Sequence, residues 1–176
     1  MTFCFFIYII WDKMGQNGIV DRLRGSFTVK TDERGRIKIP QKFLSLLESR
    51  FGREVYLTSL NGDFVLFYPL PVWKSIEARI ESLRGRGPEI EEYVSRTSYW
   101  GTECEFDPKG RILIPQDLRN SCGLQANVLL LGIIDHLVVW NSDRFREKYL
   151  QGPFGDESME KVARLLNETM PLSGNE

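Results

Sequence analysis

Alternating polar and apolar positions predict short β-strands near the start of the chain. In residues 36–39 two basic side chains alternate with two isoleucines, a period of two that is typical of a strand with one buried face. Residues 25–31 have strand character as well, with Phe27 and Val29 on one face. The polar stretch 32–35 between them predicts a turn, because aspartate tolerates turn conformations and glycine supplies a positive φ.

A helix and a hairpin are expected to follow. Residues 41–50 present apolar side chains at helical spacing directly after Pro40, a residue that suits the start of a helix. Residues 55–58 and 64–68 are rich in β-branched and aromatic side chains, and Asn61-Gly62 between them favours a tight turn. The order strand, turn, strand, helix, hairpin therefore describes the first part of the chain.

The same order returns later in the chain. The phrase Asp32–Pro40 recurs as Asp107–Pro115, with Asp, Gly, Arg, two Ile and Pro in the same places, 75 residues further on (107 against 32). The matching elements are expected at 101–106 (strand), 111–114 (strand), after Pro115 (short helix), and at 128–131 and 137–140 (second hairpin). A fixed internal period indicates one supersecondary unit used twice.

These patterns predict an α+β fold, mostly β, in which two tandem units pack as a pseudo-symmetric pair with accessory helices. Each unit has roughly 45 residues, near the lower limit for an independent core, so close pairing or oligomerisation is expected. The expected organisation is an N-terminal extension (1–23), a first unit (24–71), a helical linker (72–99), a second unit (100–145) and a helical, partly flexible tail (146–176).

The extension begins with the apolar run 3–11. This run is far shorter than the ~20 residues that span a bilayer. It also lacks the preceding cationic stretch of a secretory signal, because the first basic residue, Lys13, follows it. We favour a start codon assigned too early, with Met14, Val20 or Leu23 near the real beginning. A membrane or partner anchor remains the alternative.

Charge is balanced overall but uneven along the chain. The net charge of −1 provides no general attraction to nucleic acid. Residues 24–53, however, hold eight Lys or Arg against three Asp or Glu, whereas residues 156–176 hold five acids against two bases. Such local fields matter more than the sum when a protein docks on a polyanion.

The sequence offers little to a catalytic or cofactor-dependent function. Three cysteines without metal-ligand spacing favour a reduced, cytoplasmic setting, and we expect no metal and no cofactor. No Walker loop, dinucleotide-binding fingerprint or nucleophile elbow is present. The single histidine, His136, is expected to be a solvated residue of a hairpin turn. We therefore expect a protein that is not an enzyme.

The repeated loop is the strongest functional lead. Arg36 and Arg111 leave the turn on the polar face of a strand, where an arginine can pair with guanine in the major groove, worth ~1–3 kcal/mol of discrimination. The flanking cations are expected to address phosphates, which position a protein without reading sequence. The expected DNA-binding residues are Arg34, Arg36, Lys38, Lys109 and Arg111.

Asp32 and Asp107, with Gly35 and Gly110, are expected to orient the loops. The aspartates could cap the turn through backbone N–H groups or aim the arginine through an ion pair. A single Asp-x-x-Gly-Arg phrase would be explained by a hairpin turn with a solvated arginine. Two copies in matched contexts favour a function, because the fold alone does not require arginine at an exposed position twice.

The chain resembles the MraZ family. The resemblance covers about residues 24–150 and rests on Arg24-Gly25-Ser26-Phe27, on both Asp-x-x-Gly-Arg phrases followed by Ile-x-Ile-Pro, and on Trp140-Asn141. Two departures are Phe27, where the family often has histidine, and the 23 additional residues at the start. The family's Asp-x-x-x-Arg motif corresponds to Asp32 with Arg36 and to Asp107 with Arg111.

The resemblance implies a bacterial transcriptional regulator built from two swapped-hairpin domains of the AbrB type. It also implies a cytoplasmic, nucleoid-associated protein without a membrane partner. Such a protein forms ring-like homo-oligomers that bind direct repeats in double-stranded promoter DNA upstream of the division and cell-wall gene cluster. Two alternatives remain open: a structural or protein-interaction ring, and an antitoxin-like protein whose tail, residues 156–176, binds a partner.

Overall fold

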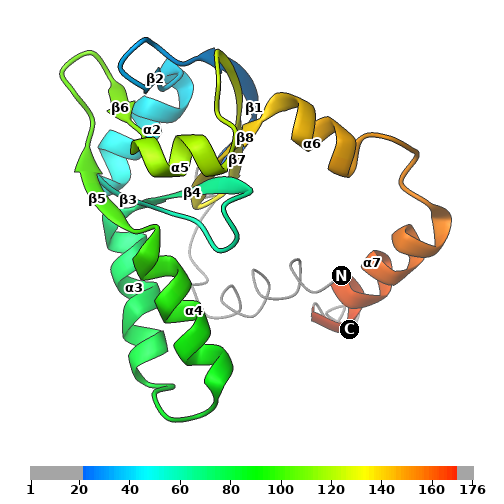
Figure 1. Cartoon of the computed structure of the whole chain (residues 1–176). Coiled ribbons are helices and arrows are strands. Elements are labelled where there is room, and N and C mark those ends of the chain that lie inside the picture. Colours follow the sequence, from blue (N-terminus) through cyan, green and yellow to red (C-terminus); the bar gives the residue numbers. More distant parts are fainter. Residues whose placement is uncertain (1–21, 170–176) are drawn as a thin grey trace, which may run out of the picture. The chain divides into compact units, whose positions relative to one another are not determined.

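The fold is organised around a six-stranded antiparallel sheet (Figure 1). The computed structural model describes residues 22–169. Residues up to Ser142 form one compact unit and those from Asp143 onward a second. In spatial order the strands of the sheet are β1 (Leu23–Lys30), β7 (Asn127–Ile134), β8 (His136–Asn141), β4 (Phe64–Pro69), β3 (Glu54–Thr58) and β5 (Thr102–Glu105).

The sheet interleaves the two repeats. Strand β1 of the first repeat pairs with β7 of the second, and β5 of the second pairs with β3 of the first. The pairing of Val29 with Val128 is matched by that of Cys104 with Val55, so the two halves follow one pseudo-twofold relation. Strands β4 and β8, which are equivalent, pair with each other at the centre. Each repeat thus completes the sheet of the other.

A two-stranded ribbon lies outside this sheet. It consists of β2 (Arg36–Lys38) and β6 (Arg111–Leu113), one strand from each repeat. Ile37 lies opposite Ile112, and both side chains are fully buried. They join a core cluster to which both repeats contribute, including Phe43 of helix α2 (Gln41–Phe51) and Leu118 of helix α5 (Gln116–Ser121). The helices begin directly after Pro40 and Pro115, as the sequence predicts.

Helices α3 (Leu70–Glu81) and α4 (Pro88–Tyr99) both contact the sheet at β3. Trp73 of α3 stacks on Tyr56 of β3, with ring centroids 4.4 Å apart. The hydroxyl of Thr58 donates to the carbonyl oxygen of Thr97 in α4 at 2.6 Å. These contacts anchor the helical linker to the first repeat's hairpin.

The second unit holds helices α6 (Ser142–Tyr149), whose first residue belongs to the first unit, and α7 (Asp156–Thr169). Helix α7 is amphipathic, and Met159, Val162 and Leu166 of its apolar stripe are exposed. Within residues 22–169 no helix has the length and apolar character needed to cross a membrane.

The predicted fold class is confirmed: the protein is α+β with a mostly antiparallel sheet. The division into segments at residues 71, 99 and 145 stays a prediction. The start-codon hypothesis concerns residues 1–23, of which 1–21 lie outside the described part of the chain. The predicted helix at 41–50 and the hairpin around Asn61-Gly62 are both present.

The expectation for His136 is wrong. The side chain is 3% exposed and stacks on Tyr68, with ring centroids 4.5 Å apart. Strand β7 continues to Ile134, so a two-residue turn of Ile134 and Asp135 places His136 at the start of β8, opposite Ile133. Ile134 adopts a φ of 63°, which an isoleucine rarely takes outside tight turns. The histidine is therefore a strand residue packed on the sheet.

Candidate functional site

The first repeated loop is organised by one carboxylate. Oδ1 of Asp32 accepts the backbone N–H groups of Arg34 at 3.0 Å and of Arg36 at 2.9 Å. Oδ2 accepts Nε of Arg36 at 2.8 Å and also lies 2.8 Å from its Nη2. Gly35, at a φ of 80°, closes the turn by donating its N–H to the carbonyl oxygen of Asp32. Asp32 thus caps the turn and holds the arginine at the same time.

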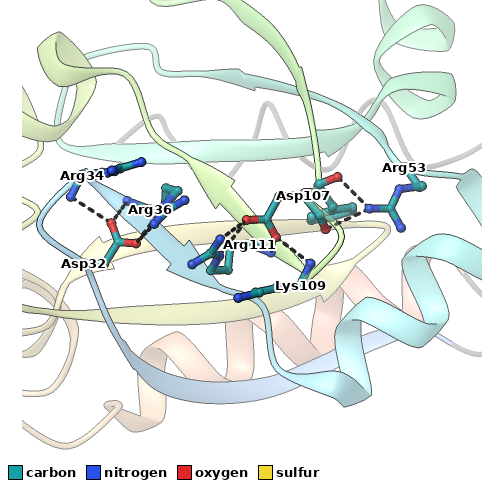
Figure 2. A network of polar contacts seen from close by, with 8 residues as sticks. Asp32, Arg34, Arg36, Arg53, Asp107, Lys109 and Arg111 are labelled. Atoms are coloured by element: carbon teal, nitrogen blue, oxygen red, sulfur yellow. Dashed lines mark hydrogen bonds and ion pairs between the residues drawn. The ribbon is translucent and has the colours of Figure 1, made fainter.

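The second loop has the same geometry. Oδ1 of Asp107 accepts the N–H groups of Lys109 at 2.8 Å and Arg111 at 3.0 Å, and Oδ2 accepts Nε of Arg111 at 2.6 Å. Gly110 has a φ of 69° and donates to the carbonyl oxygen of Asp107. Figure 2 shows both aspartates, each contacting its own arginine. Each hydrogen bond of the first loop therefore has an equivalent in the second loop.

These contacts stabilise the ionised carboxylates. The hydrogen bond from the backbone N–H of Arg36 is the main cause that lowers the pKa of Asp32 below its ordinary value. The side-chain hydrogen bond from Arg111 is the main cause that lowers the pKa of Asp107, to about 2. Both loops therefore keep their ion pairs throughout the neutral range.

The ribbon brings the two loops together. Ile37 and Ile112 point into the core, so the residues on either side of each point outward. Arg36 lies opposite Leu113, and Lys38 lies opposite Arg111. The two arginines are consequently diagonal neighbours on one outward face, a distance of roughly 7–8 Å in such ribbons. Their side chains are 25% and 28% exposed.

Each loop is also fixed by the other repeat. The N–H of Ile39, after β2, donates to the carbonyl oxygen of Gly110 at 3.0 Å. The equivalent N–H of Ile114, after β6, donates to the carbonyl oxygen of Gly35 at 3.1 Å. These two hydrogen bonds tie each loop to the ribbon strand of the other repeat.

The remaining predicted site residues surround this face. Arg34, Lys38 and Lys109 are all exposed. They lie beside Arg36 and Arg111, whose charges are paired with Asp32 and Asp107. No cluster of three His, Cys, Asp or Glu side chains able to hold a metal occurs within residues 22–169.

Sequence reasoning missed three residues beside the loops. Arg53 donates to the carbonyl oxygens of Phe106 at 2.7 Å and Asp107 at 2.9 Å (Figure 2). It also pairs with Glu48. Leu113 is an exposed leucine directly opposite Arg36. Arg119 of α5 lies against Gly35. Of the three, only Leu113 could have been noticed in the sequence. It is an apolar residue at the outward position where the first copy of the repeat has Lys38.

A family model described as "MraZ protein, putative antitoxin-like" matches residues 101–168. A protein of Halothermothrix orenii named "Transcriptional regulator MraZ" is 33% identical over 145 residues, which cover 82% of this chain and 96% of the relative. The protein of the same name from Syntrophobacter fumaroxidans is 34% identical over 118 residues, covering 67% of this chain and 78% of the relative.

The chain belongs to the MraZ family. A further protein of that name, from Acidobacterium capsulatum, is 29% identical over 140 residues and is covered to 96% of its length. The MraZ family model begins at Gly101, directly before β5, so its match contains the whole second Asp–Arg loop. The match to the family model therefore contains the second of the two loops.

Proposed function

We propose that this protein is a DNA-binding transcriptional regulator that inserts the β2–β6 ribbon into the major groove. The main support is the position of Arg36 and Arg111 on one outward face of a single two-stranded ribbon. The major groove of B-DNA admits such a ribbon, and arginine is the commonest partner of guanine there. The names of the MraZ relatives point to the same class of function.

The ion pairs aim the reading groups. Each arginine is bound to an aspartate through Nε and Nη2, which leaves Nη1 and the second N–H of Nη2 as donors for a base. A guanidinium fixed in this way loses less conformational entropy when it binds a base. Arg34, Lys38 and Lys109 contact phosphates, and Leu113 is positioned for apolar contact with a thymine methyl group.

Assembly overcomes the absence of a net positive charge. One subunit offers two loops and a net charge of −1. A ring-like homo-oligomer presents several ribbons to one duplex, and linked contacts gain effective concentration. The proposed target is a set of direct repeats in the promoter of the division and cell-wall gene cluster, which requires a cytoplasmic, nucleoid-associated protein. A cell-wall methyltransferase gene directly downstream of this gene would agree with that target.

The test uses operator DNA selected from a random duplex library. The double variant Arg36→Ala/Arg111→Ala should lose at least 10-fold in affinity for the selected duplex, because each arginine–guanine pair is worth ~1–3 kcal/mol. Arg84→Ala/Arg86→Ala is the matched control, since it removes two exposed arginines from the turn between α3 and α4. Unchanged binding by the loop variant in a gel-shift assay, with assembly intact by light scattering, would reject the proposal.

A second candidate is binding of a protein partner through α7. The exposed apolar side chains of Met159 and Val162 lie on one face of this helix, and the family description includes the word antitoxin-like. Met159→Glu/Val162→Glu separates the two functions. If DNA regulation is the main function, this variant retains operator affinity, whereas a partner-binding protein loses its partner.

A further inference from the structure

The two loops of one subunit are not equivalent, because different side chains cover their glycines. Gly35 of the first loop lies against the guanidinium of Arg119, from α5 of the second repeat. Gly110 of the second loop lies against the side chain of Leu44, from α2 of the first repeat. Positions 44 and 119 occupy the same place in the two copies, 75 residues apart. One loop therefore has an arginine where the other has a leucine.

Arg119 is held in place from the protein side. Its Nε donates to the carbonyl oxygen of Ile114 at 3.0 Å, and the N–H of Ile114 donates to the carbonyl oxygen of Gly35 at 3.1 Å. The guanidinium packs so closely on Gly35 that a methyl group at that position would collide with it. Within residues 22–169, neither terminal amino group of Arg119 has a recorded protein partner, and the residue is partly exposed.

Among residues 22–169, the position that corresponds to Arg119 at the second loop is held by Leu44. The guanidinium of Arg53, which contacts the second loop, donates to the carbonyl oxygens of Phe106 and Asp107 and pairs with Glu48. That group is used within the protein. The first loop instead combines Arg34 on one side of Gly35, Arg36 on the other and Arg119 packed on the glycine itself.

We propose that Arg119 forms a contact with a DNA backbone phosphate at the first loop that the second loop lacks. A guanidinium held through Nε presents its two terminal amino groups in the fork geometry that matches phosphate oxygens. The first loop then binds DNA more strongly than the second, so each subunit docks with a defined polarity. This inference rests on the proposed DNA-binding function.

The test replaces Arg119, which covers Gly35, by leucine, the residue type that covers Gly110. Arg119→Leu should keep the packing, because a leucine fills the equivalent position over Gly110. Its affinity should fall by the same factor for the selected operator and for an unrelated duplex of equal length, since phosphate contacts do not read sequence. The slope of log K against log salt should decrease by about 0.9 for each subunit engaged. Arg119→Lys should restore most of the slope.

Combination with the loop variants locates the contact. Arg119→Leu should cost less in an Arg36→Ala background, where the first loop is already weakened, than in an Arg111→Ala background. Thermal unfolding of each variant checks that the fold is intact. A weaker but equally salt-dependent Arg119→Leu protein would show a merely structural role and would overturn the inference. If Arg36→Ala/Arg111→Ala still binds the operator fully, the proposed function itself fails, whatever Arg119 does.

Discussion

Ile37 and Ile112 lie directly opposite each other in the β2–β6 ribbon, and both are fully buried. They are equivalent residues of the two repeats, so the local pseudo-twofold axis of the ribbon passes between them. Because both isoleucines point inward, Arg36 in β2 and Arg111 in β6, each one residue earlier, point outward. The packing of two isoleucines therefore sets the spacing of the proposed DNA-binding groups.

Shortening either isoleucine should destabilise the protein. Ile112→Ala is expected to lower the free energy of unfolding by about 2–5 kcal/mol, and Ile112→Val by about 0.5–1.5 kcal/mol, because each leaves a cavity in a packed core. Urea denaturation followed by circular dichroism, at one fixed protein concentration, measures the change. Leu113→Ala, at the exposed neighbouring position, is the control and should stay within about 0.5 kcal/mol. Equal losses at positions 112 and 113 would contradict this account of the ribbon.

Asparagine at position 107 separates the two tasks of the aspartate. Asp107→Asn keeps an oxygen that accepts the N–H groups of Lys109 and Arg111, but it removes the charge that pairs with the guanidinium. Operator affinity should fall by about 1–3 kcal/mol, whereas affinity for unrelated DNA should be kept or increased. Competition binding with both duplexes gives the ratio of operator affinity to affinity for unrelated DNA. Asp107→Ala should also disorder the turn, and an unchanged ratio in both variants would exclude an aiming role.

Arg53 should hold the second loop without affecting the first. At the first loop, Ala126 occupies the position equivalent to Arg53. The carbonyl oxygen of Ala126 accepts a hydrogen bond from the N–H of Thr31, and the carbonyl oxygen of Arg53 accepts one from the N–H of Phe106. Arg53→Ala therefore gives the second loop the residue type of the first. Amide hydrogen exchange should become faster at Lys109 and Gly110, with no change at Arg34 and Gly35.

Glu48→Gln is the matched control for this variant. It removes the ion partner of Arg53 but leaves the hydrogen bonds to the carbonyl oxygens of Phe106 and Asp107. The exchange rates in the second loop should therefore change little. Faster exchange in both loops of Arg53→Ala would indicate a general loss of stability instead of a local one.

The Asp107–Arg111 pair should persist into strong acid. The pKa of Asp107 is lowered from an ordinary value of 3.8 to about 2, so the stabilisation by the ionised carboxylate is complete above pH 4 and is lost as the pH falls toward 2. A carbon-13 NMR titration of the carboxyl group measures the midpoint. Arg111→Ala should move it back toward 3.8, and a wild-type midpoint near 3.8 would disprove the ion pair in solution.

Local pattern was sufficient to predict most helices and strands. The helix at 41–50 and the strand at 36–39 were predictable because periodicity and turn residues act within a few positions. The strand pairing was not. Nothing in the apolar face of β1 distinguishes β7 from other strands as its partner, and the swapped arrangement was expected only from the family resemblance.

The errors and omissions share a physical cause. The wrong prediction for His136 came from a strand β7 that was expected to end too early. Pairing with β1 extends β7 to Ile134, and a distant strand of this kind leaves no local pattern in the sequence. Arg53 and Arg119 contact loops that are distant in sequence, so no local motif marks them. The loop residues themselves were predictable, because a repeated turn keeps its aspartate, glycine and arginine for local hydrogen bonds.

The interleaved sheet also constrains how the chain is made. Leu23 at the start of β1 pairs with Ile134, which follows 111 residues later in the chain (134 against 23). During translation the first half therefore leaves the ribosome with an unpaired edge and waits for the second. Long-range pairing of this kind slows folding and leaves nascent chains open to wrong partners, other nascent copies among them. The interleaved pairing that brings the two arginines onto one ribbon thus requires the second repeat to be synthesised before the first can complete its sheet.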